Sequence, residues 1–157
     1  MTMCAANIYL AAAAMMIVFF HAARLAMVKF APLLSSHELA MAILAGLPGQ
    51  LIVGQHYYTF SSVAYYTGEQ ERLLNGRWNN FEYGSNAPDV PDVFLDDEKL
   101  KVLWSGSQRY YLVAKADQVK RIDRLLGPAN FEILSTSGGK ILMTNQVTDL
   151  KLGLPGN

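Results

Sequence analysis

The sequence contains a single cysteine and carries no net charge. Of its 157 residues, 13 are basic and 13 are acidic. A chain with equal numbers of positive and negative charges has no net positive electrostatic potential that would attract nucleic acid or an anionic membrane surface, so we expect no nucleic-acid partner. The one cysteine, Cys4, excludes an internal disulfide and leaves the redox compartment open. Because Cys4 lies in an apolar segment, we interpret it as a small buried hydrophobic residue rather than a reactive thiol.

The usual arrangements of metal-binding and nucleophilic residues are also missing. His21, His37 and His56 show no ligand spacing among themselves, and no cysteine joins them, so we expect no metal site. The serines do not form a nucleophile elbow. Residues 137–140, Ser-Gly-Gly-Lys, lack the upstream glycine and the spacing of a phosphate-binding loop, and they predict a hairpin turn instead.

Four aspartates lie close together in the sequence: Asp89, Asp92, Asp96 and Asp97. One interpretation is a metal or acid–base cluster. Aspartate after a proline or before a helix more often forms a turn or an N-cap, and we favour that structural role. We therefore expect no catalytic residue in this chain and no bound cofactor.

Residues 3–20 carry no charge, which is close to the minimum for crossing a bilayer, since a span needs roughly 17–25 apolar residues. A cleaved signal peptide is the alternative, but no basic residue precedes the run and no clear small-x-small cleavage site follows it. We expect a retained transmembrane helix with a juxtamembrane segment over residues 1–30, a globular domain over 31–148 and a flexible tail over 149–157.

After the apolar segment, helical and strand patterns alternate. Ser35 and Glu38 form a predicted capping box at the start of a helix that ends near Gly46. The other helices are expected at residues 56–67, from the cap Asp96 or Asp97 through Trp104, and at 119–126 with Asp117 as cap. The strands are expected at residues 50–54, 73–74 and 110–114, and in a hairpin of 131–135 with 141–144. This alternation predicts a small three-layer α/β domain with a mixed, mostly parallel sheet.

The stretch from residue 75 to residue 97 has neither a helical nor a strand period. Long loops of this kind are uncommon in compact domains and are usually functional or disordered. Disorder fits poorly, because the stretch contains several aromatic residues that a segment without buried surface does not need: Trp78, Phe81, Tyr83 and Phe94. We interpret it as a binding or docking loop.

Polar side chains in this loop suit recognition. An arginine offers a forked donor and asparagine a matched donor and acceptor, which fit sugar hydroxyls or a phosphate. The alternative is that these side chains bond the loop's own backbone and hold it rigid, and both roles can coexist. The candidate residues are Asn75, Arg77, Trp78, Asn79, Asn80 and Tyr83.

The helix expected at residues 56–67 is rich in aromatic side chains. They are Tyr57, Tyr58, Phe60, Tyr65 and Tyr66. Aromatic rings can stack on a sugar, but on a helix that covers a sheet we expect most of them to lie in the core.

An ordered series of short motifs carries a family resemblance. The motifs are Leu-Ser-Ser at Leu34, Gln-His-Tyr-Tyr-Thr-Phe-Ser-Ser at Gln55, Leu-Leu-Asn-Gly-Arg-Trp-Asn-Asn-Phe-Glu-Tyr-Gly-Ser at Leu73, Ala-Pro-Asp-Val-Pro-Asp-Val-Phe at Ala87, Leu-Trp at Leu103 and Ser-Gly-Gly-Lys at Ser137. Together they resemble the C-terminal extracytoplasmic domain of bacterial membrane glycosyltransferases related to dolichyl-phosphate-mannose protein mannosyltransferases and to the aminoarabinose transferase of lipid A. The resemblance covers about two thirds of the chain.

The resemblance implies an enzyme with many membrane helices and with catalytic carboxylates in an extracytoplasmic loop after the first helix. Nothing in this chain corresponds to that loop, so the chain resembles the tail of such an enzyme, beginning near its last membrane helix. The family places the domain outside the cytoplasm, whereas the positive-inside bias of Arg24 and Lys29 would place it inside. Two charges are a small bias, and we expect the family's orientation.

Two functions follow. In the first, the chain is the non-catalytic, periplasmic domain of an inner (plasma) membrane glycosyltransferase that uses a polyprenyl-phosphate sugar. There it packs on the catalytic membrane domain and shapes the acceptor side, with the lipid-linked sugar or the acceptor as a further partner. In the second, it is an independent membrane-anchored binding or scaffold protein without catalytic activity.

Overall fold

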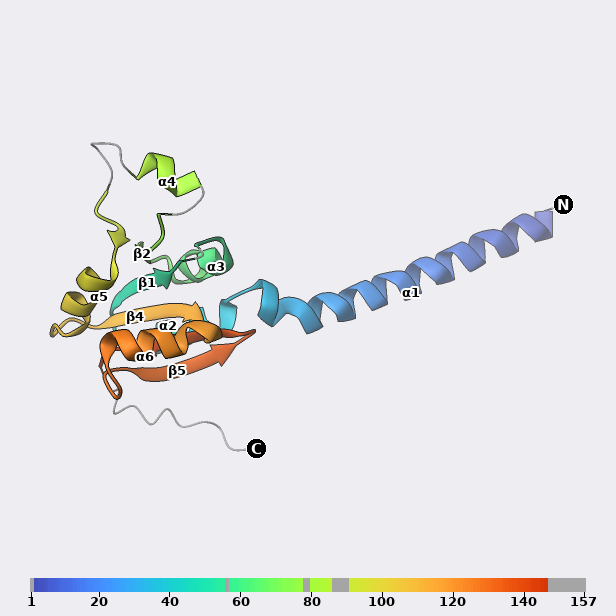
Figure 1. Cartoon of the computed structure of the whole chain (residues 1–157). Coiled ribbons are helices and arrows are strands. Elements are labelled where there is room, and N and C mark those ends of the chain that lie inside the picture. The colour runs from blue at the N-terminus through green and yellow to red at the C-terminus, as the bar shows by residue number, and fades with distance from the viewer. Residues whose placement is uncertain (1, 56, 78–79, 86–90, 147–157) are drawn as a thin grey trace, which may run out of the picture.

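The computed structural model describes residues 2–55, 57–77, 80–85 and 91–146, and it consists of a long helix joined to a small α/β domain (Figure 1). The helix, α1 (Thr2–Leu34), projects away from one end of the domain. Its segment Asn7–Leu34 is long and apolar enough to cross a membrane, with a mean hydropathy of 1.8, and none of it is buried in the protein. Helix α1 thus has the length and composition of the membrane helix expected from the sequence.

Helix α1 is longer than the apolar run of residues 3–20. It continues past Arg24 and Lys29 to Leu34, because the added residues are largely alanine, leucine and methionine, which are strong helix formers. Pro32 lies within the last turn and has no backbone N–H to give to the Val28 carbonyl, a local cost that falls at the end of the helix. The helix nevertheless continues to Leu34, directly before the domain.

The domain is built on a six-stranded sheet with the order β3-β2-β1-β4-β6-β5. The strands are β1 (Gln50–Gly54), β2 (Glu71–Leu74), β3 (Phe94–Leu95), β4 (Tyr110–Lys115), β5 (Glu132–Ser137) and β6 (Lys140–Thr144). Strands β3, β2, β1 and β4 run parallel, while β6 is antiparallel to both β4 and β5. The predicted mixed, mostly parallel sheet is confirmed.

Helices cover both faces of this sheet, which confirms the three-layer arrangement. On one face lie α2 (His37–Ala45) and α3 (Tyr57–Thr67), and on the other lie α5 (Asp97–Trp104) and α6 (Val119–Leu126); the short elements are α4 (Asn80–Gly84) and a 3-10 helix (Ala116–Gln118). The first core is centred on Leu39, Phe60, Val63, Tyr111 and Leu142. The second is centred on Ile52, Leu100, Leu112, Ile122 and Met143. Burial of these side chains at about 1.5–3 kcal/mol each drives folding.

The carboxyl ends of the parallel strands lie at the edge from which α1 projects. Lys115, the last residue of β4, pairs with Lys140, the first residue of β6. Lys140 in turn bonds backbone carbonyls at Pro32 and Ser35, where α1 ends. We call this edge the helix edge and the opposite one, where β1 and β2 begin, the far edge. In α/β sheets the carboxyl edge is the usual place for binding residues.

Two helix starts differ from expectation. The capping box at Ser35 is wrong: Ser36 is the N-cap of α2, and the Ser35 hydroxyl accepts from the His37 backbone N–H, two residues on, at 3.2 Å. The continuation of α1 to Leu34 explains the difference, because the Ser35 N–H that Glu38 would have to reach is already bonded to Ala31 O at 2.7 Å. Asp117 does not cap α6 either, since it lies inside the 3-10 helix.

The cap of α5 is as expected. The Asp96 carboxylate accepts the Lys99 backbone N–H at 2.7 Å, in the standard N-cap arrangement. The stretch before it is more ordered than its sequence pattern indicates, because it contains α4 and the edge strand β3. The expectation of no regular structure between residues 75 and 97 is therefore wrong for these two elements, which are too short to show a period.

Candidate functional site

Asn75 holds the start of the predicted docking loop at the helix edge. It follows β2 directly, adopts a left-handed backbone with φ of 52°, and donates its backbone N–H to Leu95 O at 2.8 Å. Its side-chain amide donates to Asp97 Oδ1 at 2.8 Å. Asparagine tolerates this conformation better than most residues. Asn75 therefore fixes both ends of the loop, from β2 to the first turn of α5.

Arg121 completes this anchor from a different element. Its Nη2 lies 2.6 Å from both carboxylate oxygens of Asp97. Burial disfavours the charged carboxylate, but the hydrogen bonds from Asn75 and Arg121, with the charges of Arg121 and Lys101, together outweigh it and lower the pKa of Asp97. Sequence reasoning missed Arg121, because nothing in its local pattern shows that α6 lies beside the start of α5.

Arg77 lies just beyond the anchor and is exposed. Its guanidinium carbon is 5.4 Å from the centre of the Phe94 ring, within cation–π range. A cavity of about 350 Å³ opens here, lined by Asn75, Arg77, Phe94, Leu95, Asp96 and Lys99. Arg77 and Lys99 bring two cations to it and Asp96 brings one carboxylate, and the Lys99 ammonium also bonds Asp92 at 3.3 Å. With this mixture of charges it suits a hydroxyl-rich group or a single anionic group beside Arg77.

Helix α4 presents the remaining described candidates. Phe81 packs edge-on against Tyr57 at 5.4 Å and against Phe94 at 6.2 Å, which attaches α4 to the domain. Tyr83 points away and is 95% exposed. Asn80 is the first residue of α4. Trp78 and Asn79 lie outside the described residues. Of the predicted site, the structure thus brings Asn75 and Arg77 to one cavity and Tyr83 to the adjacent surface.

The aromatic residues of α3 divide between core and surface. Phe60 is fully buried, and Tyr57 packs partly against the core. Tyr58, Tyr65 and Tyr66 are exposed, so the expectation that most of the aromatic residues lie in the core is wrong for these three. The helix covers the sheet with a narrow face, and its other tyrosines are left on the outside.

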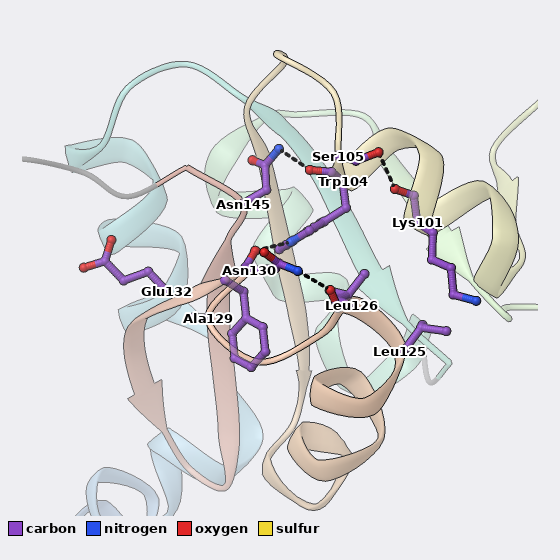
Figure 2. A pocket seen from close by; sticks show the side chains of 10 residues that line it. Lys101, Trp104, Ser105, Leu125, Leu126, Ala129, Asn130, Glu132 and Asn145 are labelled. Carbon is purple, nitrogen blue, oxygen red and sulfur yellow. Dashed lines mark hydrogen bonds between the residues drawn. The ribbon is translucent and has the colours of Figure 1, made fainter.

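A cavity of about 570 Å³ lies at the far edge between α5, α6 and the start of β5 (Figure 2). Trp104 Nε1 donates to Asn130 O at 2.8 Å, and Asn130 Nδ2 donates to Leu126 O at 2.6 Å. Asn145 Nδ2 donates to Trp104 O at 3.1 Å. These polar groups bond one another across the cavity wall (Figure 2), so they serve to hold the elements together. No predicted site residue lines this cavity.

Glu71, at the far-edge start of β2, is the one described carboxyl group whose pKa is strongly raised. Burial raises its pKa from 4.5 to about 7, and its Oε2 is buried without a hydrogen-bond partner. Among the residues that the structure describes, no group of three or more His, Cys, Asp and Glu is placed to hold a metal ion. Glu71 is therefore a half-buried acid outside any such group.

A long exposed helix that is apolar enough to cross a membrane, joined to a three-layer domain of this topology, defines the class of this protein as α/β with one candidate membrane span. The same fold occurs in ArnT, an aminoarabinose transferase, from Cupriavidus metallidurans. The undecaprenyl phosphate-bound structure of ArnT matches 71% of this chain and 20% of the ArnT chain, at 16% identity with a TM-score of 0.56. The apo structure matches 69% and 19%, at 14% identity with a TM-score of 0.55.

The likeness to ArnT establishes the fold. This chain spans about one fifth of the length of ArnT. No protein family model matches the sequence, and no curated protein matches it. The resemblance drawn from the short motifs is thus confirmed at the level of fold: the domain has the architecture of one part of a membrane glycosyltransferase.

Proposed function

We propose that the chain acts as the extracytoplasmic domain of a membrane glycosyltransferase that uses a polyprenyl-phosphate sugar. The observation that carries the proposal is the shared fold with ArnT, in which one domain of this architecture belongs to a much longer membrane enzyme. Helix α1 supports it, because a long apolar helix that is not buried in the protein can tether the domain to a membrane. The domain then lies on the periplasmic side of the inner membrane.

The proposed docking surface consists of the helix-edge cavity beside Arg77 and the exposed face of α4 with Tyr83. Phe81 fixes α4 to the domain, so the tyrosine is presented at little cost in side-chain entropy. Tyrosine and arginine are enriched at protein interfaces and carry much of their binding energy. This surface packs against the catalytic membrane domain and shapes the side from which the acceptor enters.

The lipid-linked donor is the proposed second partner. ArnT was solved with undecaprenyl phosphate. In this chain the cavity offers the Arg77 guanidinium to a phosphate or to sugar hydroxyls, with Lys99 and Asp96 beside it. The chain's role is non-catalytic, since the carboxylate loop that the family resemblance implies has no counterpart in its sequence.

Photo-crosslinking in native membranes tests this function. A crosslinking amino acid at Tyr83 is compared with one at Ser107, which is exposed in the turn between α5 and β4 at the far edge. We expect the Tyr83 position alone to give a product with a many-helix glycosyltransferase, identified by mass spectrometry. Equal products at both positions would contradict the docking surface.

A donor-turnover assay on the purified chain tests the non-catalytic role. We expect no transfer of sugar from a polyprenyl-phosphate donor. Turnover above background that disappears when one of the chain's own carboxylates, for example Asp92 or Glu71, is replaced by its amide would overturn this role. It would favour an independent enzyme instead.

A further inference from the structure

The backbone carbonyls at the end of α1 need donors from outside the helix. The last four carbonyls of an α-helix have no intrahelical partner. In α1 the Ser35 N–H still bonds Ala31 O at 2.7 Å. The Ser36 N–H, which a continuing helix would give to Pro32 O, is taken by the Ser62 hydroxyl of α3. The carbonyl of Pro32 has therefore lost its helical donor at the point where the chain enters the domain.

Lys140 supplies the missing donor from the β5–β6 hairpin. Its ammonium donates to Ser35 O at 2.9 Å and reaches Pro32 O at 3.4 Å. A cation at the carboxyl end of a helix also interacts favourably with the helix dipole. The residue is only 3% exposed, and burial lowers the pKa of the Lys140 ammonium. A buried lysine is costly unless its charge is satisfied, so these carbonyls explain its position.

The turn of the same hairpin lies directly against the helix end. Gly138 and Gly139 both have left-handed backbones, with φ of 55° and 73°. A Cβ on Gly138 would collide with the carbonyl group of Pro32, whereas a Cβ on Gly139 would meet nothing within 4 Å. Both positions favour glycine for backbone reasons, but only Gly138 is needed for close contact with α1.

Two exposed tyrosines lie next to this contact. The Tyr66 ring meets the His37 ring edge-on at 4.8 Å, and His37 begins α2 directly after the end of α1. Tyr65 packs edge-on against Tyr66 at 5.3 Å and is 82% exposed. Tyrosine is enriched at the membrane–water interface, where its ring is apolar and its hydroxyl is hydrated.

The length of α1 places its end at the lipid headgroups. The segment Asn7–Leu34, which is apolar enough to cross a membrane, has 28 residues and spans about 42 Å at 1.5 Å per residue, close to the roughly 40–45 Å of a bilayer with its headgroup regions. When this segment crosses a bilayer, its end at Leu34 lies at the level of the headgroups, beside the contact made by Gly138 and Lys140.

We propose that Gly138 and Lys140 form a rigid joint with the end of α1, which we call the helix joint, and that this joint holds the tyrosine pair Tyr65 and Tyr66 against the lipid headgroup layer. The lipid surface is thus the partner of this face of α3. The inference rests on the membrane tether of the proposed function, but it does not require a catalytic partner. The contact between the β5–β6 hairpin and the end of α1 therefore sets the orientation of the domain to the bilayer.

Spin-label accessibility tests the helix joint in the full chain. The chain, with Cys4 replaced by alanine, is reconstituted in vesicles of phosphatidylethanolamine and phosphatidylglycerol and labelled after Tyr65→Cys or, as a far-edge control, Ser107→Cys. For each spin label, the collision rate with lipid-soluble oxygen is divided by the collision rate with a water-soluble nickel chelate. We expect the ratio at position 65 to be that of a label at the membrane–water interface, and the ratio at position 107 to be that of a label in water. Equal ratios at the two positions would overturn the proposal.

Matched variants separate the joint from general damage. Gly138→Ala and Lys140→Met should remove the difference between positions 65 and 107. Gly139→Ala introduces similar backbone strain without the collision, so it should keep the difference. Lys115→Met replaces the lysine that pairs with Lys140 on the neighbouring strand, and it should also keep the difference. Circular dichroism is used to check that each variant is folded. If Gly138→Ala does not fold, the comparison of Lys140→Met with Lys115→Met tests the helix joint.

The same effect from Gly138→Ala and Gly139→Ala, or an unchanged ratio at position 65 in Lys140→Met, would refute the joint. Such a result leaves the crosslink at Tyr83 untouched, because that crosslink reports a protein contact of α4. Failure of the joint and failure of the proposed function are therefore distinguishable.

Discussion

Replacement of Asn75 should destabilise the domain far more than replacement of Arg77, although the two lie in one loop. Asn75→Gly removes the hydrogen bond to Asp97 and keeps the left-handed backbone. Hydrogen bonds to charged groups contribute roughly 1.5–3 kcal/mol. Because Asp97 keeps Arg121 as a partner, we expect a loss of about 1–2 kcal/mol. Asn75→Ala loses the same bond and adds about 1 kcal/mol of backbone strain at a φ of 52°.

Arg77→Ala, by contrast, removes an exposed side chain whose described contact is the ring of Phe94. An exposed cation–π contact contributes only about 0.5–1 kcal/mol. In thermal melts of the full chain in detergent, followed by near-ultraviolet circular dichroism, each kcal/mol should lower Tm by about 3–5 °C. We expect the order Asn75→Ala, then Asn75→Gly, then Arg77→Ala, from largest loss to smallest. An equal loss for Arg77→Ala and Asn75→Ala would refute the reasoning and make Arg77 structural rather than a docking residue.

The other predictions concern pH, truncation and membrane attachment. The raised pKa of Glu71 means that the folded state holds a proton that the unfolded state has released, so stability should fall as pH rises from about 4.5 through 7. Glu71→Gln should abolish this fall and, after allowance for partial exposure, gain about 1–2 kcal/mol at pH 8 in urea melts; an unchanged pH profile would count against it. A chain beginning at Ser35 should be soluble and show the circular dichroism of a folded α/β domain, since both cores lie beyond α1; an unfolded product would show that α1 is part of the fold. The full chain should stay with membranes on carbonate extraction, and its release would speak against α1 as a span.

Most of the fold follows from local sequence signals. The hairpin around Gly138 and Gly139, the cap at Asp96 and the aromatic helix α3 are all encoded by residues close together in the chain, and these predictions hold. Strand β3 has only two residues and exists because β2 offers it an open edge. No period can be read from two residues, so a strand of this kind is invisible in a single sequence.

The candidate site depends more heavily on contacts between distant residues. Asn75 and Arg77 could be chosen from their chemistry, but the role of Asn75 as an anchor is set by Asp97 and Arg121, 22 and 46 residues away along the chain. The Ser35 capping box fails because the preceding helix extends to its start: the carbonyl of Ala31 in α1 takes the Ser35 N–H that a local rule assigns to the box. Local rules describe isolated elements, and these residues act between elements.

The bond between Lys140 and the end of α1 also has a consequence for biosynthesis. Lys140 follows Ser35 by 105 residues. At a synthesis rate of about 5–20 residues per second, the ribosome needs roughly 5–20 s to reach the lysine after α1 has been made. Throughout that interval the helix can enter the bilayer and settle its depth and tilt, while the growing domain is still free to turn. With the helix joint that we propose, the orientation of the domain is then set only when Lys140 has been made, 105 residues after Ser35 at the end of the helix.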